Sequence, residues 1–157
     1  MSRGLFVAGL AVFVAIVAWL ATTNGWSAVE ALGVPGLQPV FADVRSLTGA
    51  HVALANGIDP LVANAGDPWH RPFNYPRIWL LPAQLGIGPA QTDLVAAALF
   101  ASFGLGLLAL VPLATTPATS WLLLVLLFAP ATWLAIERAN NDLVIFPLLA
   151  FAEIGRA

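Results

Sequence analysis

The chain has 157 residues, of which 60% are hydrophobic and only 9% charged, and its formal net charge is −2. Its mean hydropathy of +0.88 lies outside the usual range for a soluble globular domain, so the composition predicts a membrane protein. All six basic residues are arginines spread along the chain, which argues against a nucleic-acid-binding protein. The absence of cysteine excludes disulfides and thiolate chemistry.

Three hydrophobic stretches are long enough to cross a bilayer, for which a helix needs about 20 apolar residues. We expect spans at about 4–22, 94–114 and 119–136. The first could instead be a cleaved signal peptide, but its apolar run exceeds the roughly 7–15 residues of such a segment, so we favour a retained anchor. A fourth apolar run, 143–152, is too short to span. We therefore expect 1–157 to be a single but incomplete membrane domain, the front part of a longer protein.

The predicted fold class is an all-α, polytopic transmembrane helical protein with a long external first loop. Arg3 before the first span predicts a cytoplasmic N-terminus, which places residues 23–93 and 137–142 on the same external face. Gly104 and Gly106 are expected to allow close helix packing. Four tryptophans lie near the predicted membrane boundaries, where an amphipathic ring is favoured: Trp19, Trp26, Trp121 and Trp133.

Within the external loop, residues 41–57 repeat apolar side chains with helical spacing, which predicts an amphipathic helix. Asn56 and Gly57 supply a left-handed end for this helix. Asp43, near its start, could simply cap the helix, because aspartate is among the best N-cap residues. The functional alternative is a general base just outside the first span.

The stretch "DPWHRPFNYPRIWLLP", 67–82, contains four prolines, which forbid a long regular helix and favour a rigid loop against the membrane. Arg71 and Arg77 could bind a phosphate group with their planar forks of donors. The alternative is that both are interfacial arginines that reach lipid phosphates. His70 has no neighbours at a spacing typical of metal ligands, so we predict no metal site.

The segment "ERANND", 137–142, is the second polar cluster. Glu137 and Arg138 could pair at the membrane edge, and Asn141 or Asp142 could cap the next helix. The cluster is more polar than a turn requires. Ionisable residues at membrane depth favour a functional hypothesis.

In order along the chain, "FADVR", "NGIDP", "NYPRIWLLP" and "IERANNDLVIF" resemble the N-terminal part of the polytopic bacterial glycosyltransferases of the GT-C superfamily. The similarity is to the polyprenol-phosphate-mannose-dependent mannosyltransferase-like branch. That branch has an Asp in the first external loop, a Gly-x-Asp/Asn-Pro-Tyr turn, a Tyr-Pro-Pro segment and a later Arg-Gly-Asn motif. Leu61, Arg77 and Ala139 depart from the Tyr, the second Pro and the Gly of this pattern.

The resemblance implies a bacterial inner (plasma) membrane enzyme that transfers a sugar from a polyprenyl-phosphate donor to an acceptor hydroxyl on the external face. Asp43 would be the catalytic base, and Asp59 or Asp67 would replace it if Asp43 is only a cap. The expected substrate contacts are Arg71, Arg77 and Arg138 for the phosphate, and Asn74, Tyr75 and Asn141 for the sugar or headgroup.

The expected partners are the lipid donor and the bilayer, with no nucleic acid and no cofactor. The chain has no Asp-x-Asp pair, so no metal is expected. We expect the 157-residue chain alone to be inactive in transfer. The alternative is a non-enzymatic multi-span membrane protein, a subunit or transporter fragment, whose external loop binds a partner.

Overall fold

The computed structural model describes residues 2–155, and within that range every regular element is a helix. Two helices are long and apolar enough to cross a membrane: α1 (Ser2–Thr23) and the helical stretch Pro89–Leu113, whose main part is α4 (Thr92–Ala109). They coincide with the first two predicted spans. Their length and composition indicate a membrane protein.

The third predicted span, 119–136, is not one continuous helix, although its two parts together are long and apolar enough to form a broken span. Two helices, α5 (Pro117–Leu127) and α6 (Pro130–Arg138), occupy this stretch and meet at a bend of 46°. Pro130 causes the break, because its ring disfavours helical geometry in the preceding residue, and Ala129 is extended with φ −65° and ψ 147°. The last helix, α7 (Asp142–Ile154), covers the short apolar run 143–152.

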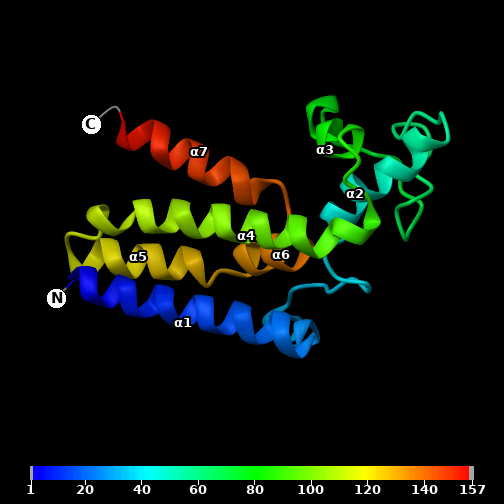
Figure 1. Ribbon diagram of the computed structural model, residues 1–157. Coiled ribbons are helices and arrows are strands. Elements are labelled where there is room, and N and C mark those ends of the chain that lie inside the picture. The colour runs from blue at the N-terminus through cyan, green and yellow to red at the C-terminus, as the bar shows by residue number, and fades with distance from the viewer. Residues whose placement is uncertain (1, 156–157) are drawn as a thin grey trace.

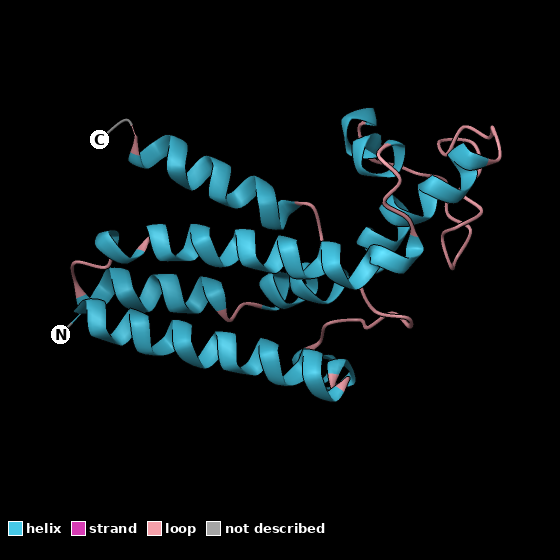
Figure 2. Ribbon diagram, viewed as in Figure 1, coloured by secondary structure: helices cyan, strands magenta, loops and turns pink. Residues whose placement is uncertain are grey.

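Helices α1, α4, α5 and α7 run side by side, with α4 packed on α7 and α1 on α5 (Figure 1). Helix α6 lies where this bundle meets the outer part, and most of the loops lie at that same end (Figure 2). Trp26 and Trp133 are only 2% and 3% exposed, so they are core residues rather than boundary anchors. Each tryptophan packs against aromatic rings, and the free energy gained by burying its large ring outweighs the preference of tryptophan for the membrane interface.

The outer part, 24–91, is built around α2 (Ala42–Ala55), which lies within the predicted helix 41–57. Gly57 follows α2 with φ 70°, so the predicted left-handed ending is confirmed. Gly49 on α2 touches Gly66 so closely that an added Cβ would lie 2.5 Å from the Gly66 carbonyl carbon. The loop therefore packs directly on α2, of which eight of the 14 residues are buried.

The rest of the outer part has only short elements, as the prolines predict. They are α3 (Leu81–Gln84) and the 3₁₀ segments Trp26–Leu32, Arg77–Leu80 and Pro89–Gln91; a further 3₁₀ turn, Val111–Leu113, ends the α4 stretch. A small apolar core of its own, formed by Leu47, Ala50, Phe73, Leu80 and Ala83, joins α3 and the segment Arg77–Leu80 to α2, whereas Trp26–Leu32 packs on α6 and contributes to the main core. The small core fixes the position of the loop relative to α2.

Candidate functional site

The residue before α2 has an unusual backbone. Phe41 has φ 66° and ψ 43°, a left-handed conformation that bulky residues rarely adopt. Its ring packs against Trp26 and Phe100 with centroid distances of 5.3 and 5.6 Å, and its N–H donates to the Glu137 carbonyl at 3.0 Å. Such strain persists only where the surroundings determine it. These contacts set where the first turn of α2 begins.

Asp43 lies in that first turn and is not the N-cap. Phe41 occupies the cap position, and no side chain caps the helix. The capping alternative is therefore wrong, although a negative charge in the first turn still favours the helix dipole. The Asp43 carboxylate instead accepts a hydrogen bond at Oδ2 from Asn140 Nδ2 at 2.8 Å, across 97 positions of sequence. The first turn of α2 and the "ERANND" segment therefore meet in one place.

The turn that carries Asn140 is also well defined. Ala139 has φ 47° and ψ 55°, a left-handed residue that ends α6. Asn140 Oδ1 accepts from the backbone N–H of Asp142 at 2.8 Å, while its backbone N–H donates to the Ala135 carbonyl at 2.9 Å. Both ends of the Asn140 amide are thus occupied, and its orientation toward Asp43 is fixed.

A cavity of about 300 Å³ lies between the start of α2 and the α6–α7 turn, at the lower end of the size range for small-molecule sites. Its polar lining is Asp43, Arg138, Asn140 and Asp142, and its apolar lining is Ala131, Leu134 and Ala135. Arg138 Nε forms an ion pair with Glu137 Oε2 at 3.2 Å, but neither of these two atoms makes a hydrogen bond within residues 2–155. A carboxylate and a cation predicted from distant motifs therefore face the same space.

Tyr75 adds a hydroxyl near this carboxylate. Its half-buried ring stacks edge-on against Phe73 at 5.6 Å, within the small apolar core of the outer part. Burial, and next the negative charge of Asp43, raises the pKa of the Tyr75 phenol. The phenol therefore stays protonated at physiological pH and can donate a hydrogen bond.

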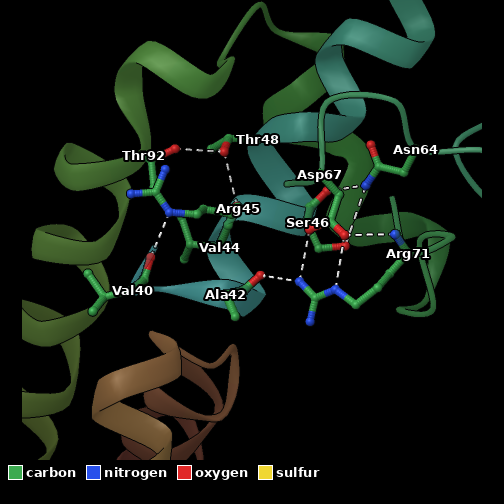
Figure 3. Close-up of polar contacts among 10 residues, drawn as sticks. All are labelled: Val40, Ala42, Val44, Arg45, Ser46, Thr48, Asn64, Asp67, Arg71 and Thr92. Carbon is green, nitrogen blue, oxygen red and sulfur yellow. Dashed lines mark hydrogen bonds and ion pairs between the residues drawn. The ribbon is translucent and has the colours of Figure 1, made fainter. Parts of the chain in front are cut away.

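Arg71 is placed differently from the sequence expectation (Figure 3). Its Nε and Nη2 donate to the two carboxylate oxygens of the fully buried Asp67 at 3.0 and 2.9 Å, and Nη2 also donates to the Ala42 carbonyl. The guanidinium lies 4.7 Å from the ring centroid of Trp69, and hydrogen bonding to Asp67 raises the pKa of Arg71. Arg71 thus ties the loop to the first turn of α2, beside Asp43.

The other predicted contacts lie outside the cavity lining. Arg77 donates to Asp59 Oδ2 at 2.9 Å on the surface, and this hydrogen bond lowers the pKa of Asp59. Asn74 is exposed. Asn141 is 3% exposed, and its amide nitrogen and oxygen have no hydrogen-bond partner within residues 2–155.

Asn140 and Asp142 are the polar lining residues that we did not select from the sequence as site residues. They belong to the same "ERANND" segment as the predicted Asn141. Which of the two asparagines faces Asp43 depends on the left-handed conformation at Ala139, and an alanine does not signal such a conformation.

Comparison with known proteins finds no family model, no curated protein and no solved structure that matches this chain. Within residues 2–155, no group of three or more His, Cys, Asp or Glu side chains is arranged to hold a metal ion. Function is therefore inferred from the residues and their geometry.

Proposed function

We propose that this chain belongs to a multi-pass glycosyltransferase of the bacterial inner membrane, which transfers a sugar from a polyprenyl-phosphate donor to an acceptor hydroxyl. In this proposal the N-terminus is cytoplasmic, and residues 23–93 and 137–142 lie on the external face. One observation carries the proposal: Asp43 and Arg138 line a single cavity, and Asn140 holds the Asp43 carboxylate there. The reaction requires such a base and such a cation in one site.

The proposed step is a displacement at the anomeric carbon of the donor sugar. Asp43 takes the proton of the acceptor hydroxyl as the hydroxyl oxygen bonds to that carbon. The bond from the anomeric carbon to the phosphate oxygen breaks, and its electron pair leaves with the polyprenyl phosphate. Arg138 stabilises the charge that develops on the phosphate, and the neutral phenol of Tyr75 is a hydrogen-bond donor beside the site.

The backbone of the α6–α7 turn is compatible with the proposal. The glycosyltransferase pattern that the sequence motifs resemble has glycine where this chain has Ala139, and the structure gives that position a left-handed conformation, φ 47°. Glycine adopts this conformation without steric cost. A glycine at position 139, as in the pattern that the sequence resembles, would therefore fit this backbone.

Among the predicted phosphate contacts, the geometry favours Arg138. The Arg71 guanidinium already donates two hydrogen bonds to the Asp67 carboxylate, so Arg71 serves as a positioning residue. Arg77 is 67% exposed and paired with Asp59, so its predicted contact requires the donor phosphate to replace that carboxylate. Arg138 alone of the three lines the Asp43 cavity.

Donor binding by the 157-residue protein in lipid nanodiscs tests this assignment. Arg138→Gln is expected to weaken binding of polyprenyl-phosphate sugar roughly tenfold, the usual cost of a charge-assisted hydrogen bond. Arg3→Gln is the matched control, since Arg3 is an exposed arginine on α1 that lines none of this cavity. Equal affinities for the parent and Arg138→Gln would remove Arg138 from the donor site.

Transfer is measured with the complete reading frame that encodes these residues. Asp43→Asn should lower transfer about 10²–10⁴-fold, because asparagine cannot accept the acceptor proton. Glu30→Gln, an exposed carboxylate outside the cavity, should leave it unchanged. If Asp43→Asn transfers sugar at the parent rate while Asp59→Asn does not, the base is Asp59.

A partner-binding protein is the second candidate, and one observation favours it. Val62, Ile78 and Leu85 of the outer part are 75%, 72% and 73% exposed, more apolar surface than an isolated loop in water needs. In that case Val62→Ser and Leu85→Ser would abolish a stable complex in membrane extracts. Asp43→Asn would leave this complex, and the cellular function that depends on it, intact.

A further inference from the structure

A second cavity, of about 480 Å³, lies between the end of α1, the segment before α2 and the start of α4. Polar side chains of four types form part of its lining: Asn24, Gln38, Arg45 and Asp93. Apolar side chains form the rest, including the aromatic rings of Trp26, Phe41 and Phe100. The cavity shares no lining residue with the Asp43 cavity.

Arg45 extends from α2 toward Val40 and α4, away from Arg71 on the other side of the helix (Figure 3). Its Nε donates to the Val40 carbonyl at 2.6 Å, and its terminal amino groups donate no hydrogen bond within residues 2–155. The bond to Val40 fixes the guanidinium while leaving its outer donors available. A fixed guanidinium with available donors suits a phosphate group.

Asp93, in the first turn of α4, supplies the opposite charge. It is exposed and forms neither an ion pair nor a side-chain hydrogen bond in the part of the chain that the structure describes. Arg45 and Asp93 thus line one cavity without pairing with each other. The cavity therefore offers one cation and one anion to a ligand.

An apolar cavity of about 390 Å³ continues this space along the bundle. The two cavities share Ala21, Ala97 and Phe100, so they lie next to each other between α1 and α4, and together they are called the groove below. Small residues keep the apolar part open. An added Cβ at Gly104 would meet nothing within 4 Å, whereas one at Gly106 would lie 2.8 Å from Phe146 and Pro147, so only Gly106 serves helix packing as expected.

We propose that this groove holds one membrane phospholipid whose headgroup carries a phosphate and a primary ammonium. Arg45 binds the phosphate, Asp93 accepts hydrogen bonds from the ammonium, and an acyl chain lies along the apolar part between α1 and α4. One positive and one negative side chain in the same cavity favour a zwitterionic lipid over an anionic lipid. A primary ammonium is favoured over a quaternary one because only the former can donate hydrogen bonds to Asp93.

The groove follows the two helices that are long and apolar enough to cross a membrane. Its polar end lies at the end of α1 and the start of α4, where a headgroup would meet the bilayer surface, and its apolar end faces the hydrocarbon. The site is separate from the proposed transferase site, and its test does not depend on sugar transfer.

Native mass spectrometry of the 157-residue protein from nanodiscs of equal phosphatidylethanolamine, phosphatidylcholine and phosphatidylglycerol tests the proposal. We expect one phosphatidylethanolamine retained per chain. Arg45→Gln should lower its retention roughly tenfold, the effect of losing a charge-assisted hydrogen bond. Asp93→Asn should remove the preference over phosphatidylcholine.

Gly104→Leu tests the groove without touching the headgroup contacts. Leucine fits the open space, favours the helix more than glycine does, and fills the groove. Gly4→Leu is the matched control, because an added Cβ there also meets nothing within 4 Å and Gly4 lies outside the groove. Phosphatidylethanolamine should be lost from Gly104→Leu and retained by Gly4→Leu.

Three results would overturn the proposal. Equal retention of all three lipids in the parent would mean annular lipid only. Unchanged retention in Gly104→Leu would place the lipid elsewhere. Displacement of phosphatidylethanolamine by polyprenyl phosphate would make the groove a site for that lipid instead.

Discussion

Asn140 Nδ2 donates to Asp43 Oδ2 at 2.8 Å and so joins the α6–α7 turn to the first turn of α2. Asn140→Ala should lower the free energy of unfolding by about 1.5 kcal/mol, because a hydrogen bond to a charged group is lost. Denaturation in detergent, followed by tryptophan fluorescence, measures this change. Asn74→Ala, at an exposed asparagine, is the control and should be neutral. Equal stability of the two variants would mean that the bond contributes nothing.

Ala139→Gly is expected to stabilise the protein by about 1 kcal/mol, because a left-handed conformation costs an L-residue roughly 1–2 kcal/mol and costs glycine almost nothing. The gain is partly offset by the freedom of glycine in the unfolded chain. Ala139→Val should destabilise, since a β-branched side chain is still less compatible with φ 47°. The same denaturation experiment checks both. Destabilisation by glycine would contradict the assigned backbone conformation.

Asp67→Asn should lower the free energy of unfolding by about 2–3 kcal/mol, because it removes the partner of Arg71 at a fully buried carboxylate. Asp59→Asn breaks an equivalent arginine contact at the surface and should have no measurable effect. Limited proteolysis of the outer part gives a second measurement. A similar response of the two variants would show that the Asp67–Arg71 fork does not hold the loop.

Tyr75 is the only tyrosine in the chain, so near-ultraviolet absorbance reports the ionisation of this one residue. Burial and Asp43 raise the pKa of Tyr75 above its ordinary value of 10.0, so tyrosinate should form in the folded protein only well above pH 10.0. The neutral phenol contributes stability that is complete below the unfolded pKa and is lost as the pH rises through the folded pKa. Asp43→Asn should lower this pKa only in part, since burial is the larger cause. An ordinary pKa in the parent would place Tyr75 in solvent.

Gly49→Ala should destabilise the outer part by about 1–3 kcal/mol, because the added methyl group would enter the backbone of Gly66. Gly104→Ala, in the open groove, should instead stabilise its helix by about 0.5–1 kcal/mol. The pair separates the general effect of glycine in a helix from the close approach of two backbones. Stabilisation by both substitutions would contradict the Gly49–Gly66 contact.

The sequence was sufficient for features that depend on run length and local chemistry. The first two spans and the helix that ends before Gly57 follow from apolar spacing and turn residues. The break at Pro130 also had a visible signal, since proline disfavours helical geometry in the residue before it. The hydrophobicity of residues 119–136 alone does not reveal this break, and it predicts one continuous span.

Contacts between distant segments could not be predicted residue by residue. Asp43 and "ERANND" were expected on one face, but the choice of Asn140 over Asn141 depends on the backbone at Ala139. The partner of Arg71 is four residues away in an irregular loop, where no periodicity brings two side chains together. Tertiary packing decides both, and local propensity does not.

The last turn of α6 also supplies acceptors to the segment before α2. Glu137 accepts the N–H of Leu37 at Oε1 (2.9 Å) and the N–H of Phe41 at its carbonyl (3.0 Å). During translation, Leu37 and Phe41, which carry the donors, are synthesised about a hundred residues before Glu137, which carries the acceptors. During synthesis the outer segment therefore cannot form these hydrogen bonds until α6 has been made. A nascent chain that stops before Glu137 would also lack Asn140, which binds the Asp43 carboxylate.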